Sequence, residues 1–224
     1  MSDTTNRPTR RVTVLTDNDS WVLPYSQRVV DVARGLGDEA NLIRDQRDLP
    51  EGDIAFFLGC VNIVKPNALA RNKRNLVVHA SDLPKGRGFS PWTWLVLEGS
   101  DRIPVCLIDA ADQVDSGAVV HKEDIALFGT ELVDDLRSDI GRKTVELCER
   151  FLSEAVLPLG QPQAGEASVY PRRTPRDSEL DVDKDIRSQF NLLRTVDNDR
   201  YPAFFRINGA RYILRIERFD GGEG

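Results

Sequence analysis

Short runs of β-branched and apolar residues alternate with segments of helical periodicity over residues 1–157, and this alternation restricts the fold more than any other feature. The pattern predicts strands over 11–16, 41–44, 53–58, 76–79, 103–108 and 118–121. It predicts helices over 25–36, 67–71, 91–97 and 130–154. Such alternation is typical of an α/β domain with a mostly parallel sheet, in which ligands bind beyond the carboxyl ends of the strands.

The rest of the chain differs in character from this domain. We assign residues to a disordered tail (1–10), the α/β domain (11–160), a Pro/Gln/Gly-rich linker (161–167) and a small C-terminal region (168–224). In that last region, 186–194 has a helical pattern. Two apolar runs, 203–207 and 212–216, flank Asn208-Gly209, which predicts a β-hairpin.

Composition narrows the class of protein. The 224 residues include 30 Lys and Arg against 36 Asp and Glu, a net charge of −6, which disfavours nucleic acid as the main partner. No apolar run approaches the roughly 18 residues of a membrane span, and the polar N-terminus has no secretory signal, so we expect a cytoplasmic protein. The three cysteines (Cys60, Cys106 and Cys148) lie far apart in apolar surroundings and predict neither disulfides nor a metal site.

Two loops carry most of the polar chemistry. His79 ends a predicted strand and opens the loop Ala80-Ser81-Asp82-Leu83-Pro84-Lys85-Gly86-Arg87-Gly88-Phe89, after which a helix begins at once. Loop amides beside a helix N-terminus suit an anion or oxyanion. The second loop follows another strand and holds three carboxylates, Asp109, Asp112 and Asp115, with Ser116-Gly117 predicting a tight turn. A single histidine at a strand end is more often structural than catalytic, so neither loop alone identifies a reaction.

Together the two motifs resemble those of the folate-dependent N-formyltransferases, which include methionyl-tRNA, glycinamide ribonucleotide and sugar-nucleotide enzymes. His79-Ala80-Ser81-Asp82-Leu83-Pro84 is similar to the family's Asn-x-His and Ser-Leu-Leu-Pro stretch, and Asp115-Ser116-Gly117 to its Asp-x-Gly. Residues 170–177 and 201–204 resemble segments that follow the catalytic domain in the tRNA and sugar enzymes, so the resemblance covers most of 53–216. The form of the His79 loop looks most like the sugar-nucleotide branch. The resemblance implies a Rossmann-like formyltransferase domain with a mostly parallel sheet.

The resemblance also implies a reaction and a set of residues. A formyl group would pass from 10-formyltetrahydrofolate, as cosubstrate, to a primary amine, with no metal involved. His79 would accept the amine proton and Asp115 would orient the imidazole, with Lys85 and Asn75 completing the catalytic set. The folate would lie against Phe57, Leu58, Gly59, Cys60, Asp109 and Asp112. The acceptor would bind over Arg87, Gly88 and Phe89.

One position departs from the family pattern. The family's Asn, two residues before the His, is Val77 here. Asn75 lies on the same side of the strand but roughly 13 Å from His79, so it would serve only if the strand bulges. Asn62 and Lys85 are alternative donors to the oxyanion on neighbouring loops.

The identity of the acceptor rests on charge and length. The chain from 166 onward holds 11 acidic and 11 basic residues, so this region is neutral and not basic, which disfavours tRNA. The tRNA enzymes carry a large C-terminal domain, whereas only about 57 residues follow the linker here. The purine enzyme typically ends soon after its catalytic domain, so the presence of residues 170–204 argues against it. We therefore expect a nucleotide-linked amino sugar, with a 4-amino-4,6-dideoxy sugar favoured and its diphosphate held by Lys85 and Arg87. The alternatives are a methionyl-tRNA-type or other amine formyltransferase, a formyl-folate hydrolase, and a catalytically impaired folate- or nucleotide-binding module. A homodimer is left open.

Overall fold

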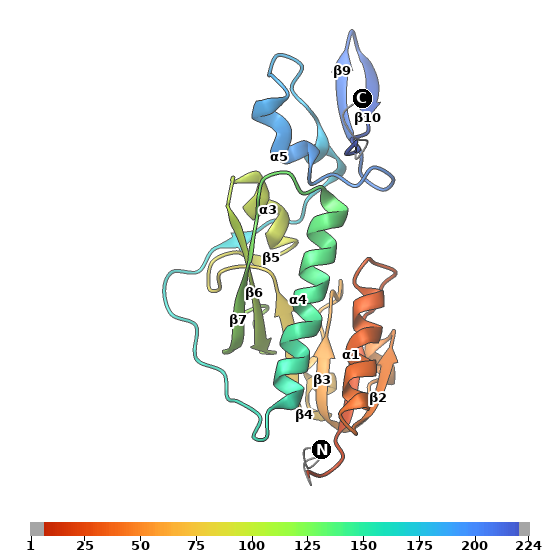
Figure 1. Cartoon of the computed structure of the whole chain (residues 1–224), viewed down its shortest axis with the longest axis vertical. Coiled ribbons are helices and arrows are strands. Elements are labelled where there is room, and N and C mark those ends of the chain that lie inside the picture. Colours follow the sequence, from red (N-terminus) through yellow and green to blue (C-terminus); the bar gives the residue numbers. More distant parts are fainter. Residues whose placement is uncertain (1–6, 220–224) are drawn as a thin grey trace.

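The computed structural model describes residues 7–219 and has a six-stranded mixed sheet at its centre (Figure 1). The strands are β1 (Arg11–Leu15), β2 (Glu39–Ile43), β3 (Gly52–Phe57), β4 (Asn72–His79), β6 (Arg102–Asp109) and β7 (Val119–Ala126). Their order is β2-β1-β3-β4-β6-β7. The pairs from β2 to β4 are parallel, whereas β6 runs antiparallel to both β4 and β7. The predicted, mostly parallel α/β domain is confirmed, with an antiparallel edge that the pattern did not reveal.

The two long helices cover one face of this sheet. The helices are α1 (Leu23–Gly35), α2 (Pro66–Leu69), α3 (Pro91–Leu97), α4 (Val133–Ser153) and α5 (Phe190–Leu193). Helices α1 and α4 contact each other and bury their apolar stripes against the sheet (Figure 1). Phe151 of α4, for example, meets Phe56 of β3 edge-on, with ring centroids 6.1 Å apart. Burial of this stripe supplies the main hydrophobic stabilisation of the domain.

Loops and short elements cover the opposite face. A second apolar cluster lies there: Leu15, Leu49, Ala55, Phe57 and Ala68. His79 pairs directly with Cys106 of β6, and Val77 pairs with Ile108, so these four side chains share one face. His79 therefore lies on the side of the sheet that α1 and α4 leave free, where loops can approach it.

Strand β4 is longer than its apolar run. It begins at Asn72 rather than Leu76, because polar side chains in its first half find partners at the end of the sheet. Lys73 pairs with Asp53 at 2.7 Å and Arg74 with Asp109 at 2.8 Å. A search for apolar residues alone misses such a half-strand.

The N-terminal segment is fixed to the end of α1. Residues 1–6 of the predicted tail lie outside the described residues, whereas Arg7 and Arg10 both pair with Asp38, each at 2.6 Å. Burial pushes the pKa of Asp38 upward, but the hydrogen bonds from the two guanidinium groups outweigh it and lower the pKa.

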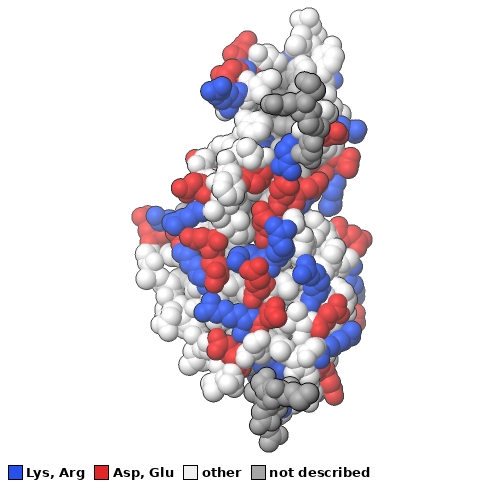
Figure 2. Space-filling view, viewed as in Figure 1, with Lys and Arg blue, Asp and Glu red and all other residues white. Residues whose placement is uncertain are grey.

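The surface charges are mixed in sign. Figure 2 shows Lys and Arg side chains interspersed with Asp and Glu over the face on which α4 lies. Lys143 and Arg150 of α4, for example, both pair with Glu123 of β7. No helix in residues 7–219 has the length and hydropathy needed to cross a bilayer.

The C-terminal region contains a hairpin and a short helix where they were predicted, but the second hairpin strand begins two residues earlier and the helix is shorter than the predicted 186–194. A 3₁₀ turn (Arg187–Gln189) leads into α5, and β9 (Ala203–Ile207) pairs antiparallel with β10 (Ala210–Leu214). Asn208 and Gly209 have φ values of 51° and 79°, the left-handed conformation that a tight two-residue hairpin turn requires.

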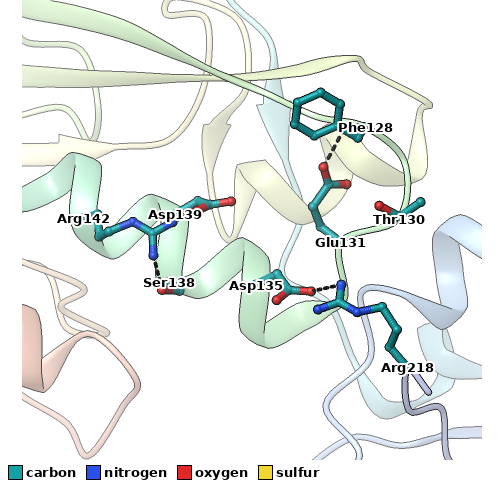
Figure 3. A pocket seen from close by; sticks show the side chains of 8 residues that line it. All are labelled: Phe128, Thr130, Glu131, Asp135, Ser138, Asp139, Arg142 and Arg218. Carbon is teal, nitrogen blue, oxygen red and sulfur yellow. Dashed lines mark hydrogen bonds and ion pairs between the residues drawn. The ribbon is translucent and has the colours of Figure 1, made fainter. Parts of the chain in front are cut away.

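A buried ion pair fastens this region to the α/β domain. Arg194, which follows α5, is 2% exposed and pairs with Glu131 at 2.9 Å, just before α4. Glu131 also accepts the backbone N–H groups of Phe128 and Gly129. Glu131 also lines a pocket of about 280 Å³ to which none of the predicted site residues contributes. Figure 3 shows the side chains around it.

We expect Glu131→Ala to lower the free energy of unfolding by about 3 kcal/mol, because it leaves the Arg194 guanidinium buried without its anion. Asp134→Ala is the matched control, since Asp134 is also acidic and near the start of α4 but 90% exposed. It should cost less than about 1 kcal/mol. Urea denaturation measures both, and equal losses would contradict the buried-pair interpretation.

Candidate active site

The imidazole of His79 lies between two oxygen acceptors at the end of β4. Its Nε2 atom is 2.9 Å from the carbonyl oxygen of Gly86, and its Nδ1 atom is 3.4 Å from Oδ1 of Asp115. The side chains of His79 and Asp115 are only 7% and 8% exposed. The structure therefore brings together the two residues that the sequence motifs singled out, 36 positions apart in the chain.

The loop after His79 supplies main-chain atoms to both partners. The Gly86 carbonyl faces His79, and the Gly88 N–H donates to Oδ2 of Asp115 at 2.9 Å. Gly88 has a φ of 99°, and a Cβ atom there would lie 2.5 Å from the carbonyl oxygen of Tyr170. Only glycine fits this position, which accounts for the second glycine of the Gly-x-Gly sequence in the loop.

The carboxylate loop reaches His79 by turning back along the sheet. Because β6 is antiparallel to β4, Asp109 ends its strand opposite Leu76, away from His79. The chain then passes so close to its own start that a Cβ on Gly117 would lie 1.6 Å from the Asp109 carbonyl oxygen. Asp115 has a φ of 56° at this turn. The Asp-x-Gly motif thus has a steric cause: Gly117 permits the return, and Asp115, the left-handed residue two positions before it, carries the carboxylate.

The segment predicted as a linker lies along the same loops. Residue Gln161 pairs with Val119 of β7, and β8 (Val169–Tyr170) pairs in parallel with β5 (Arg87–Gly88). Ser168 accepts the Gly86 N–H at 2.9 Å through its hydroxyl oxygen. The Gln163 amide contacts the Asp115 turn and Arg87. Gln163 and Ser168 were not predicted as site residues, because the Pro/Gln/Gly-rich stretch and the residue after it give no signal of long-range pairing.

Several predicted residues lie apart from the His79–Asp115 pair. Asn75 donates its side-chain amide to the carbonyl oxygens of Leu69 and Asn72, at 2.9 and 3.2 Å. Asp109 pairs with Arg74 on the face that α4 covers. Asp112 and Lys85 are exposed on their loops, and no side-chain partner contacts either within residues 7–219.

The predicted folate-lining residues belong to the end of β3. Phe57 and Leu58 are buried, Gly59 turns with a φ of 61°, and the Cys60 thiol donates to the Leu15 carbonyl oxygen. Burial raises the pKa of Cys60 to about 12, so this thiol is unreactive near neutral pH. Cys60 and Ala110 pack on the same apolar cluster, which brings the end of β3 and the carboxylate loop to one side of the sheet.

Asp17 holds the loop that follows β3. Its carboxylate accepts the backbone N–H groups of Val61 and Asn62, at 2.8 and 2.9 Å, and the side-chain amides of Asn18 and Asn62. Burial alone would raise the pKa of Asp17, but these hydrogen bonds outweigh it and lower the pKa. The Asn62 amide, a candidate oxyanion donor, is engaged by Asp17.

Remaining predicted residues lie at the outer edge of the His79 loop. Phe89 is 47% exposed, and the Arg172 guanidinium lies 5.4 Å from its ring centroid. Arg87 is half-buried and held by Gln163 at 2.6 Å. An aromatic ring and several cations thus border the His79 loop, an arrangement suited to a phosphorylated or nucleotide ligand.

No protein-family model matches the sequence. Among solved structures, a methionyl-tRNA formyltransferase from Clostridium thermocellum is similar with a TM-score of 0.78 and 23% identity, covering 95% of each chain. A 4-N formyltransferase from Francisella tularensis has a TM-score of 0.71 and 16% identity over 93% of this chain and 97% of that one. HypX from Aquifex aeolicus, in complex with tetrahydrofolic acid, has a TM-score of 0.72 and 15% identity over 93% of this chain but 38% of its own. The chain therefore has the formyltransferase fold, as its motifs predicted.

The Asp17 contacts predict a pH dependence of stability. Because the folded pKa lies below the ordinary value of 3.8, the carboxylate stabilises the fold above that value and loses its contribution as the pH falls through the folded pKa. We expect Asp17→Asn to cost about 1–2 kcal/mol at pH 7, since its amide cannot accept as many N–H groups. Urea unfolding at pH 7 and at pH 3 should show the difference between variant and wild type shrinking in acid. Asp19→Asn, 94% exposed beside it, serves as the control. A difference that stayed constant with pH would contradict the assignment.

Proposed function

We propose that this chain is an N-formyltransferase that moves a formyl group from 10-formyltetrahydrofolate to the primary amine of a nucleotide-linked amino sugar. The observation that carries the proposal is the buried His79–Asp115 pair, held by a glycine loop at a strand end in a formyltransferase fold. The pair matches the chemical demand of the reaction, because an attacking amine must lose a proton and a histidine can accept it.

The proposed reaction uses the two nitrogens of His79 differently. The neutral amine attacks the formyl carbon, a C–N bond forms, and the formyl oxygen becomes an oxyanion. The amine first replaces the Gly86 carbonyl oxygen as the partner of Nε2 of His79, and Nε2 then accepts one amine proton. Asp115 meanwhile faces Nδ1 and stabilises the charged ring. The bond from the formyl carbon to N10 of the folate then breaks, and His79 returns the proton to that nitrogen. The products are a formamide and tetrahydrofolate.

The oxyanion needs a donor other than the residue at position 77. Val77 packs between two apolar clusters and offers no hydrogen bond. Of the two alternatives on neighbouring loops, Asn62 already donates to Asp17, whereas the Lys85 side chain extends from the His79 loop without a partner in the described structure. We therefore assign the oxyanion contact to Lys85, because a cation near the developing charge lowers the barrier.

The folate is assigned to the surface between the end of β3 and the carboxylate loop. Apolar side chains are exposed on both sides of it: Val61 (48%), Ile63 (70%) and Val114 (46%). Exposed apolar groups beside backbone amides suit a flat, partly polar ring system. The similar HypX structure with tetrahydrofolic acid supports this choice of cosubstrate.

The acceptor is assigned to the outer edge of the His79 loop. Arg87 and Arg172 supply positive charge there, since Lys85 is assigned to the oxyanion, and the exposed Phe89 ring offers a stacking surface. A nucleoside diphosphate needs two or three cations and a flat apolar contact, which this edge provides. Similarity to a 4-N formyltransferase supports an amino sugar as the group that is formylated.

A tRNA acceptor is the second candidate, and one observation favours it. This chain and the Clostridium tRNA enzyme cover 95% of each other, so length does not separate the two functions as the sequence analysis expected. The charge of the chain disfavours a tRNA acceptor, because the net charge is −6 and Figure 2 shows acidic and basic side chains mixed over the face that it displays.

We expect His79→Asn to lower kcat by about 10²–10⁴-fold, the usual contribution of a general base. His121→Asn, which changes the other histidine in the chain, should leave kcat unchanged, because His121 lies on β7 away from both loops. Formyl transfer is followed by release of tetrahydrofolate in variants whose unfolding temperature has been checked. Near-native turnover by folded His79→Asn would remove His79 from the mechanism.

The acceptor is tested by competition at moderate salt. Nucleoside diphosphates should raise the unfolding temperature according to their concentration over Kd, whereas aminoacyl-tRNA should not. Incubation with 10-formyltetrahydrofolate and a 4-amino sugar nucleotide should give the formamide. Faster formylation of aminoacyl-tRNA would overturn the sugar assignment. Folate turnover without any acceptor would indicate a hydrolase, and nucleotide binding without turnover an impaired binding module.

A further inference from the structure

The side-chain amide of Gln163 makes three hydrogen bonds to the two loops, using both of its donors and its oxygen. Its Nε2 atom donates to the carbonyl oxygens of Asp115 and Gly117, both at 2.8 Å. Its Oε1 atom accepts from the Arg87 guanidinium at 2.6 Å. This residue lies in the chain between α4 and β8, far from either loop in sequence, and it is half-buried among exposed neighbours.

The contacts from Gln163 are made to the turn at Asp115, whose backbone conformation is unfavourable without them. Asp115 adopts a left-handed φ of 56°, which is less favourable for any residue with a Cβ atom than for glycine. In that conformation its carboxylate reaches Nδ1 of His79 with one oxygen and the Gly88 N–H with the other. The two carbonyl oxygens that bracket the turn point to the same amide group, so Gln163 fixes the direction in which the carboxylate leaves the backbone.

The same amide also sets the place of Arg87. Nε of Arg87 is buried without a hydrogen-bond partner in the described structure, so the contact with Gln163 is what holds the guanidinium. A glutamine is suited to this task because it donates to the turn and accepts from the arginine at once. Glutamate at this position would keep the acceptor and lose both donors.

We propose that Gln163 is a positioning residue for formyl transfer, which aligns the Asp115 carboxylate with His79 and holds Arg87 for the acceptor. The inference rests on the proposed function. It assigns a catalytic contribution to a segment whose composition is that of a linker, and it predicts separate effects on kcat and on the acceptor KM.

The test compares three variants of the full chain. Gln163→Ala should lower kcat by about 10- to 100-fold, because small misplacements of a catalytic group are costly, and should raise the acceptor KM. Gln163→Glu should lower kcat similarly but leave the acceptor KM near the wild-type value, since Arg87 keeps its partner. Gln161→Ala, two residues away with only backbone pairing to Val119, should match the wild type. The KM for 10-formyltetrahydrofolate should stay constant throughout.

Two further readouts separate positioning from a merely structural role. In an Asp115→Asn background, Gln163→Ala should change kcat by less than about threefold, because residues that act as a unit are not additive. Hydrogen exchange of the Gly88 N–H should become faster in Gln163→Ala and remain slow in Gln161→Ala, which needs no turnover to measure.

The outcomes distinguish this inference from the proposed function. An active wild type with Gln163→Ala equal to Gln161→Ala overturns the positioning role alone. Multiplicative losses in the Asp115→Asn background overturn it as well, because Gln163 would then act elsewhere. A folded wild type that transfers no formyl group to any amine overturns the proposed function and the inference with it.

Discussion

Asp115 contacts three parts of the chain at once: the end of β4, the loop that follows β4 and the segment that follows α4. One oxygen faces His79 at the end of β4 and the other accepts the Gly88 N–H of the neighbouring loop. The backbone of the same residue is held by Gln163 from the segment after α4. Because a buried carboxylate is costly without donors, each of these contacts depends on the others being made. Removal of any one leaves a buried polar group unpaired.

The sheet topology makes this convergence geometrically available. Helices α1 and α4 cover one face, so the other face is left to loops, and His79 and Val77 lie on that face. The antiparallel β6 sends its following loop back toward His79, where a parallel strand would have ended beside it directly. The return requires glycine at position 117, because any Cβ would collide with the Asp109 carbonyl. The direction of β6 and the glycine at position 117 thus together place Asp115 beside His79.

Much of this arrangement could be predicted from the sequence, for reasons that are local. Strand and helix periodicity predicted the α/β domain, and Asn208-Gly209 predicted the hairpin. Two short motifs singled out His79 and Asp115, which the structure places side by side. What failed depended on contacts between distant residues. The first half of β4 is polar and is stabilised by ion pairs across the sheet, and the direction of β6 has no local signature. Gln163 lies in a stretch with linker composition, and its amide partners are backbone atoms that no side-chain pattern records.

We propose that His79 and Asp115 act as one catalytic unit, which a double-variant cycle tests most directly. Formyl transfer is measured at saturating 10-formyltetrahydrofolate and acceptor for wild type, His79→Asn, Asp115→Asn and the double variant. Residues that work through each other are not additive, so the double variant should have a kcat within about threefold of the slower single variant. If the double variant is instead slower by the product of the two single losses, the residues act independently and the proposed unit does not exist.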